Sequence, residues 1–312
     1  MPPSCNKLAA NKDKQRGSAM RLIWPWQDRQ RRFSWLKASA FALVMLPGIR
    51  LTYQTATGEF GLLAMAYGGL TYWSGVWATV VLLMALAVTP IIRVFRWPAL
   101  VDVRRMIGVM ALIYTIAHII LYFGLRSWNF ERIGIETVTR LTLFVATLST
   151  IGLIVLGATS LDAAIQRMGV KGWQRLHNTN YIISALALLH VVLARGTYAE
   201  QYLLCGLFVW LMLWRVLDRY RLGSDAKALL ALAVFCCLFT AFLEVGFMWV
   251  RRGYDVMGTL RINFMFAPAE IGVQPPWQVL AFGLVFAFGA MARAALRVRT
   301  ASLAARQTGS PA

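Results

Sequence analysis

Eight apolar segments, each long enough to cross a lipid bilayer, restrict the fold of this chain more than any other feature of its sequence. A hydrocarbon core about 30 Å thick is spanned by about 20 apolar residues in a helix. The segments that we expect to cross are residues 36–53, 70–92, 106–124, 141–160, 174–194, 201–217, 228–250 and 277–294. The chain is therefore predicted to be an all-α, polytopic membrane helical bundle with about eight transmembrane helices.

The positive charges predict how these helices are oriented. The net charge of +19 would suit a nucleic-acid-binding protein, but the apolar spans exclude that class. Lysine and arginine are enriched in the cytoplasmic loops of membrane proteins. With the N-terminus inside, 24 of the 32 Lys and Arg residues belong to the inner side and eight to the outer side. We therefore expect both termini in the cytoplasm, with a basic N-terminal extension over residues 1–34.

The three histidines are the first candidate functional residues. An ionisable side chain inside a membrane span is costly, and it is by default a candidate for a functional site. His118 lies about six residues, and His190 about four, from the outer ends of their spans. Two imidazoles at a similar depth on neighbouring helices could supply both axial ligands of a b-type haem. The alternative is that each histidine forms hydrogen bonds between helices.

The third histidine, His177, lies near the inner end of its span, level with Arg104 and Arg105. Thirteen residues separate it from His190, which leaves the two about 140° apart around an ideal helix. Either the helix is over- or underwound, for instance by a π-bulge, or the two histidines serve different faces. The two arginines are either charges that flank the inner side or a clamp for a haem propionate or a flavin phosphate.

Glu244 has two alternative roles, and the four cysteines have a structural role only. Glu244, near the outer end of its span, is either a proton-relay acid or a side chain that reaches the membrane surface. The four cysteines have neither a disulfide framework nor zinc-ligand spacing, so we expect them to act as small apolar side chains.

The run from Thr89 to Phe123 resembles the ferric-reductase-like transmembrane superfamily. More closely, the chain resembles the MsrQ, or YedZ, type, which is the haem-binding membrane subunit of the periplasmic methionine-sulfoxide reductase system. The shared motifs are Arg-Arg-Met-Ile-Gly starting at Arg104, a histidine thirteen residues after Arg105, and a later Trp-Gln-Arg-Leu-His followed by Leu-His. The resemblance extends over about residues 36–218.

This resemblance implies a six-helix haem-binding core over residues 35–222. Two additional transmembrane helices with an outer loop would follow over residues 223–296, and a cytoplasmic tail over residues 297–312. The chain would be a multi-pass b-type cytochrome of the bacterial inner membrane and an electron-transfer subunit of an oxidoreductase system. Its partners would be a cytoplasmic flavin reductase or quinol as the donor and a periplasmic molybdopterin methionine-sulfoxide reductase as the acceptor.

The resemblance also implies roles for individual residues. His118, His177 and His190 match the three histidines of the family, and we expect them to bind haem iron. Arg104 stands where the wider superfamily has a fourth histidine, so an ordinary second haem is in doubt. We expect one haem b at His118 and His190. A second haem, FMN or quinone near His177, Arg104 and Arg105 are the alternatives.

Two other classes of protein compete with this interpretation. The first is a haem-free transporter or membrane scaffold, which the two additional helices and Glu244 would suit. Against this class, the sequence of the chain lacks the repeated pairs of broken helices that are typical of transporters. The second is a ferric reductase membrane component that works with another partner, because the chain has no nucleotide-binding motif of its own. The colour of the purified protein separates the first class from a cytochrome, and activity with metal chelates favours the second.

Overall fold

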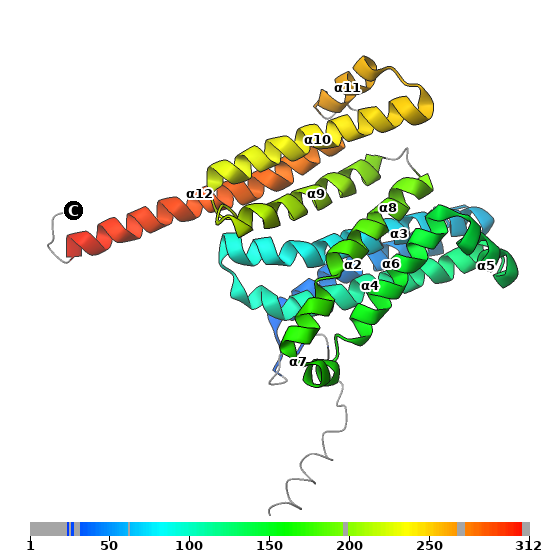
Figure 1. Ribbon diagram of the computed structural model, residues 1–312, viewed down its shortest axis with the longest axis horizontal. Helices are drawn as coiled ribbons and strands as arrows, with labels where there is room; N and C mark the ends of the chain where they lie inside the picture. Colours follow the sequence, from blue (N-terminus) through cyan, green and yellow to red (C-terminus); the bar gives the residue numbers. More distant parts are fainter. Residues whose placement is uncertain are drawn as a thin grey trace, which may run out of the picture. The chain divides into compact units, whose positions relative to one another are not determined.

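The computed structural model describes residues 24, 26–27, 32–61, 63–195, 199–266 and 272–307, and it confirms the predicted all-α fold (Figure 1). The described residues contain helices, turns and one isolated bridge, but no β-strand. The elements are α2 (Trp35–Ala56), α3 (Leu63–Phe95), a 3-10 turn η1 (Pro98–Leu100), α4 (Val101–Leu125), α5 (Phe130–Thr139), α6 (Leu141–Ala158), α7 (Asp162–His177), α8 (Asn180–Arg195), α9 (Ala199–Arg219), α10 (Ala226–Arg252), α11 (Val256–Phe264) and α12 (Pro275–Gln307).

By its internal contacts the chain divides into two units, one that ends at Leu43 and one that starts at Val44. In the first unit, the described residues include a bridge between Gln27 and Phe33 and a stacked pair formed by Trp24 and Trp26, with ring centres 5.2 Å apart. The second unit contains all of the helices from α3 onward and the candidate functional site.

Among the described residues, six helices are long and apolar enough to cross a membrane, namely α3, α4 with η1, α6, α9, α10 and α12. The bent pair of α7 and α8 provides a seventh span if it is counted as one. This number is lower than the predicted eight because α2 falls outside the group. Lys37, Pro47 and Arg50 lower the hydropathy of that helix.

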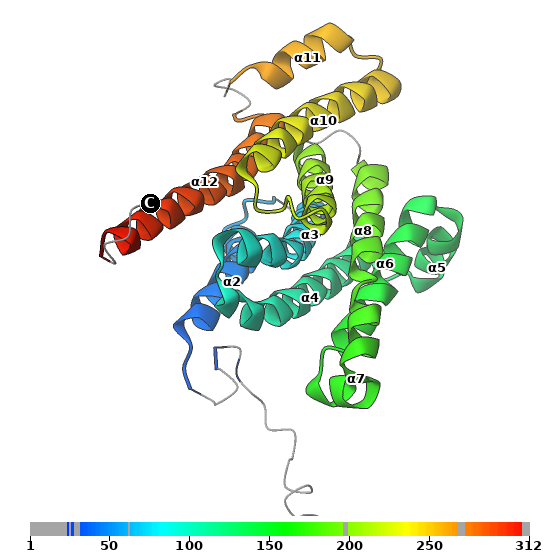
Figure 2. The same ribbon diagram turned by 60° about the vertical axis from the view of Figure 1, so that its left-hand side comes forward.

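The predicted single helix over residues 174–194 is wrong, because one helix ends at His177 and the next begins at Asn180. His177 is the last residue of α7, whereas His190 lies well inside α8, and the two helices are bent by 42° (Figure 2). The short polar run Asn178-Thr179-Asn180 lies at this break. The two histidines therefore belong to different helices. Neither a π-bulge nor an over- or underwound helix is needed to explain how they are oriented.

Pro47 and Tyr114 explain how α2 packs against α4 within the second unit. The Tyr114 hydroxyl donates to the Val44 carbonyl at 2.8 Å and accepts from the Gly48 N–H at 2.9 Å. An ordinary helix would join these two backbone groups directly. The tyrosine is therefore inserted into the hydrogen-bond ladder of α2, which is a recognised cause of helix bending beside a proline.

The main apolar core lies among α3, α9, α10 and α12. Trp210 and Trp214 of α9 are fully buried there, together with Leu86 of α3 and Val279 of α12. Helices α10 and α12 lie side by side in both views (Figures 1 and 2). The expected final span, 277–294, lies within α12, which continues without a break to Gln307.

Two arginine contacts join the ends of the core helices. Arg93 of α3 forms an ion pair with Asp218 of α9. Arg293 of α12 donates to the backbone carbonyl of Val94, also in α3. The helices that follow residue 222 are thus packed onto the same core as α3 and α9.

Candidate functional site

A cavity of about 650 Å³ lies among α3, α4, α6, α8 and α9, with α5 at one end. Its walls are mostly apolar, with side chains such as Leu82 and Ile119. His118 of α4 and His190 of α8 line the same cavity. A concave, mostly apolar pocket with a few polar groups is typical of a cofactor or small-molecule site.

The two histidine rings face each other across a short distance. Their ring centres are 6.4 Å apart, with an angle of 69° between the ring planes. The sequence predicted that these two residues lie at a similar depth on neighbouring helices, and the structure brings them together. Their role as metal ligands stays a prediction.

Each ring is oriented by a backbone carbonyl from another helix. Nδ1 of His118 lies 2.8 Å from the Thr71 carbonyl oxygen of α3, and Nδ1 of His190 lies 3.0 Å from the Thr142 carbonyl oxygen of α6. A carbonyl oxygen only accepts hydrogen bonds, so Nδ1 carries the proton in both rings. The neutral imidazole then has an unprotonated Nε2, the form in which histidine binds a metal ion.

Gly75 of α3 provides the space that the His118 ring needs. A Cβ atom built on Gly75 would lie 2.9 Å from Cε1 and 3.0 Å from Nδ1 of the imidazole. Real Cβ atoms almost never approach another heavy atom below about 3 Å without a shift of one of the two. Gly75 also lines the cavity, so the absence of a side chain at this position contributes to the shape of the site.

The remaining predicted site residues lie elsewhere. His177 stacks on Trp173, with ring centres 4.1 Å apart, and its Nε2 is 3.3 Å from the Thr159 hydroxyl. Arg104 and Arg105 are exposed in the first turns of α4, and their charges act on the His177 imidazole. The cavity lining described by the structure does not include these three residues. The structure thus gives two separate groups, His118 with His190, and His177 with the two arginines.

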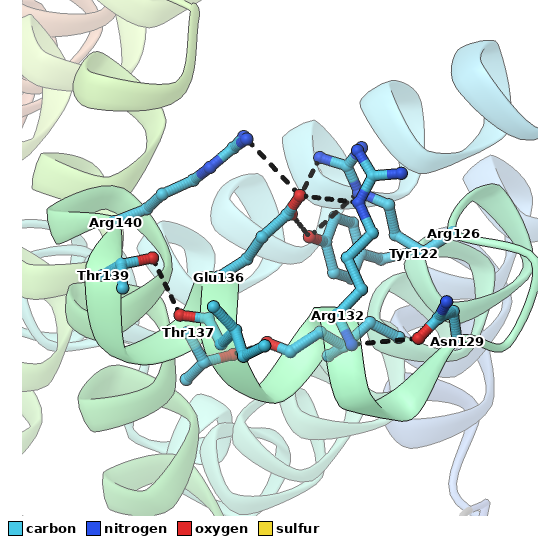
Figure 3. Close-up of polar contacts among 10 residues, drawn as sticks. Tyr122, Arg126, Asn129, Arg132, Glu136, Thr137, Thr139 and Arg140 are labelled. Atoms are coloured by element: carbon cyan, nitrogen blue, oxygen red, sulfur yellow. Dashed lines mark hydrogen bonds and ion pairs between the residues drawn. The ribbon is translucent and has the colours of Figure 1, made fainter.

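Glu136 of α5 forms a polar cluster that the sequence interpretation missed (Figure 3). Its carboxylate is paired with Arg126 at 3.1 Å, Arg132 at 3.0 Å and Arg140 at 3.4 Å, and it accepts from the Tyr122 hydroxyl at 3.2 Å. The hydrogen bond from Arg132 is the largest cause that lowers the pKa of Glu136, and it outweighs the opposing effect of burial. Glu136 is therefore ionised at neutral pH.

The segment that carries this cluster lies between two predicted spans, and no helix was predicted for it. The residues Phe130–Thr139 form α5, in which Asn129 caps the first turn by accepting from the Arg132 N–H at 2.9 Å. An asparagine before the first turn is a recognised helix start signal, and it could have indicated this helix.

Glu244 lies apart from both histidine groups. It is 8% exposed in α10, so it does not reach the surface, and it hydrogen-bonds to the buried Asn263 of α11. Within the described part of the chain, its Oε2 atom has no hydrogen-bond partner. Its role as a proton-relay acid stays a prediction.

The fold and the histidine pair define a class of protein, the multi-pass membrane proteins of the ferric-reductase-like type. The family described as ferric reductase like transmembrane component matches residues 72–188, which contain His118 and end two residues before His190. Curated relatives narrow this class further: the chain belongs to the family of protein-methionine-sulfoxide reductase heme-binding subunits, MsrQ.

Three relatives illustrate the extent of the similarity. The MsrQ protein of Bordetella pertussis is 33% identical over 202 residues, which are 62% of this chain and 94% of the relative. The MsrQ protein of Azospira oryzae is 28% identical over 202 residues, which are 64% of this chain and 86% of the relative. Magnetosome protein MamZ of Magnetospirillum gryphiswaldense is 29% identical over 163 residues, but these cover only 25% of that protein. No solved structure matches the chain.

Proposed function

We propose that this chain is a haem-binding electron-transfer subunit of the bacterial inner membrane that delivers electrons to a methionine-sulfoxide reductase. One observation carries the proposal. His118 and His190 face each other in one apolar cavity, and a backbone carbonyl holds each ring so that its Nε2 is available. The names of the curated relatives, which are heme-binding subunits, support it.

The geometry of the two rings fits a single metal ion between them. Two nitrogen–metal bonds of about 2 Å, and roughly 1 Å from each nitrogen to its ring centre, separate two ring centres by about 6 Å. The observed separation is 6.4 Å. No cluster of three or more His, Cys, Asp or Glu side chains that could hold a metal occurs among the described residues. Two protein ligands suffice for haem, because the porphyrin supplies the other four nitrogens.

Bound haem b supplies one-electron oxidation and reduction. The residues of this chain determine its setting. His118 and His190 would both bind the haem iron, and this would favour electron transfer over the binding of oxygen. The Thr71 and Thr142 carbonyls fix the two imidazole orientations. The apolar walls disfavour additional positive charge in the cavity, and they therefore favour the reduced state.

The second histidine group suits the donor side. The stacked Trp173 and His177 pair, together with the charges of Arg104 and Arg105, offers an aromatic face and two cations. Aromatic rings and guanidinium groups are suitable partners for the ring system and the phosphate of FMN. We place the entry of electrons from a cytoplasmic flavin reductase, FMN or quinol at this group. The acceptor, a periplasmic molybdopterin reductase, would then approach the opposite end.

The topology that we propose keeps both termini in the cytoplasm. This requires that α2 crosses the membrane as well, in addition to the six apolar helices and the bent pair of α7 and α8. The excess of Lys and Arg on the inner side, 24 of 32, supports this orientation. The three domain boundaries predicted after residues 34, 222 and 296 remain part of the proposal.

The test is a dithionite-reduced-minus-oxidised visible spectrum of the purified full-length protein, with haem quantified per chain. The wild type should show a b-type spectrum, and His118→Ala or His190→Ala should abolish it. Imidazole added to either variant should restore part of the spectrum, because it occupies the vacated ligand position. An unaltered spectrum in both variants would show that these histidines are not the ligands. A colourless wild type, even after reconstitution with haem, would favour a transporter or scaffold.

A further inference from the structure

The charged side chains that line the cavity gather near one end of it. They are Arg126, Arg140 and Glu200. Arg126 follows the last turn of α4, and Arg140 connects α5 to α6. His118 and Arg126 are eight residues apart on α4, so they are separated by about 12 Å along the helix axis.

Both arginines are held in place by neighbouring side chains. Arg126 donates to the Tyr122 hydroxyl at 3.2 Å and pairs with Glu136 at 3.1 Å, and Arg140 pairs with the other oxygen of Glu136 at 3.4 Å (Figure 3). Each guanidinium has five N–H donors. Within the described part of the chain, these contacts engage two donors of Arg126 and one of Arg140. The remaining donors can serve a group inside the cavity.

The charges of the cluster do not balance. Glu136 is one carboxylate among three guanidinium groups, those of Arg126, Arg132 and Arg140. The Glu136 cluster itself therefore carries two excess positive charges. Glu200, the acidic residue of the described lining, reduces the excess at this end of the cavity to one, and it accepts from the Tyr72 hydroxyl at 3.0 Å.

We propose that Arg126 and Arg140 form a carboxylate-binding subsite, which takes the two propionate groups of the haem held by His118 and His190. This inference rests on the proposed function and extends it from the iron to the edge of the macrocycle. Two carboxylates would neutralise the two excess positive charges of the Glu136 cluster, and guanidinium pairs with carboxylate in a bidentate manner. Glu136 and Tyr122 are positioning residues, because they hold the guanidinium groups in place. Tyr122 also lines the cavity, whereas Glu136 is not part of the described lining.

Arg132 provides a matched control for this subsite. It contacts the same carboxylate, at 3.0 Å, but its side chain is 59% exposed and it is not part of the described cavity lining. Replacement of Arg132 by glutamine removes one charge from the cluster, as replacement of Arg126 or Arg140 does. Only the latter two changes alter a side chain of the described cavity lining.

The experiment compares iron protoporphyrin IX with its dimethyl ester, in which both propionates are uncharged. Full-length chain in lipid nanodiscs, produced under haem limitation, is titrated with each compound and binding is read from the Soret band. The variants are Arg126→Gln, Arg140→Gln and the control Arg132→Gln. The wild type should bind the ester more weakly than the free acid. Each cavity variant should bind the free acid at least about tenfold more weakly than the wild type, the size of one lost charge-assisted hydrogen bond.

The ester also serves as the test of folding. A cavity variant that binds the ester as well as the wild type is folded, and its loss is then specific to the carboxylates. The Arg132→Gln variant should bind the ester like the wild type, and it should lose less affinity for the free acid than either cavity variant. Equal affinity of the wild type for the acid and the ester, or equal losses for all three variants, would overturn the subsite. If the wild type bound neither compound, the proposed haem function itself would fail.

Discussion

Replacement of Gly75 by alanine tests the geometry of the histidine site without touching either histidine. The new Cβ atom would lie 2.9 Å from Cε1 and 3.0 Å from Nδ1 of the His118 ring. The ring cannot simply turn away, because Nδ1 donates to the Thr71 carbonyl at 2.8 Å. Either this hydrogen bond lengthens, or helices α3 and α4 move apart.

Two opposing effects decide the result. Alanine stabilises a helix interior by about 0.5–1 kcal/mol relative to glycine. Overpacking a close contact costs about 1–3 kcal/mol. The steric term is larger, so Gly75→Ala should destabilise the protein by about 1 kcal/mol or more. Gly68, in the same helix, has open space around its built Cβ atom, so Gly68→Ala should have only the favourable term.

The assay is thermal unfolding in detergent, combined with the reduced-minus-oxidised spectrum. Gly75→Ala should lower Tm by about 2–4 °C relative to the wild type and shift or broaden the haem bands, whereas Gly68→Ala should do neither. The cost of Gly75→Ala should vanish when His118 is also replaced by alanine, because the clashing ring is then absent. If Gly75→Ala behaves like Gly68→Ala, or costs the same without His118, the described packing of this ring is wrong.

Three other predictions concern the polar cluster, the second histidine group and the topology. The pKa of Glu136 is lowered in the folded protein, so its ion pairs stabilise the fold above about pH 4.5 and lose this effect as the pH falls through the lowered pKa. The Tm difference between wild type and Glu136→Gln should therefore be largest at neutral pH and shrink in acid, and a constant difference would contradict this. His177→Ala should retain the full cavity haem signal and one haem per chain. Loss of half the haem would instead make His177 an iron ligand. Cysteines placed at the two ends of α10 should react with an impermeant maleimide from opposite sides, Arg252→Cys from outside and Lys227→Cys only after the membrane is opened.

Part of this structure was predictable from the sequence because it depends on properties of single helices. Length and hydropathy identify the spans, and position along a span gives the depth of His118 and His190. The break after His177 was also indicated by the three polar residues that follow it, but the apolar pattern of α8 directly after them concealed it. Helix α2 is the weakest predicted span, because Pro47 and Arg50 lie within an otherwise apolar stretch.

Other parts were not predictable because they depend on which helices are neighbours. Nothing in the sequence near Thr71 or Thr142 indicates that their carbonyls orient two histidines that are 47 and 48 residues away. The Glu136 cluster combines α4, α5 and the start of α6, and its arginines resemble ordinary loop charges until the helices are assembled. A single sequence shows which residue types are present for such a site. Which of them come together is decided by the packing of the helices.

The contacts of the two histidines couple the site to the packing of four helices. His118 belongs to α4 but is oriented by α3, and His190 belongs to α8 but is oriented by α6. A ligand that binds both imidazoles therefore joins the α3–α4 pair to the α6–α8 pair, and any separation of these pairs removes an imidazole from it. Binding to the native state alone stabilises that state. The haem proposed here should consequently stabilise the packing of these four helices. The loss of either histidine should lower the stability of the bundle as well as its redox function.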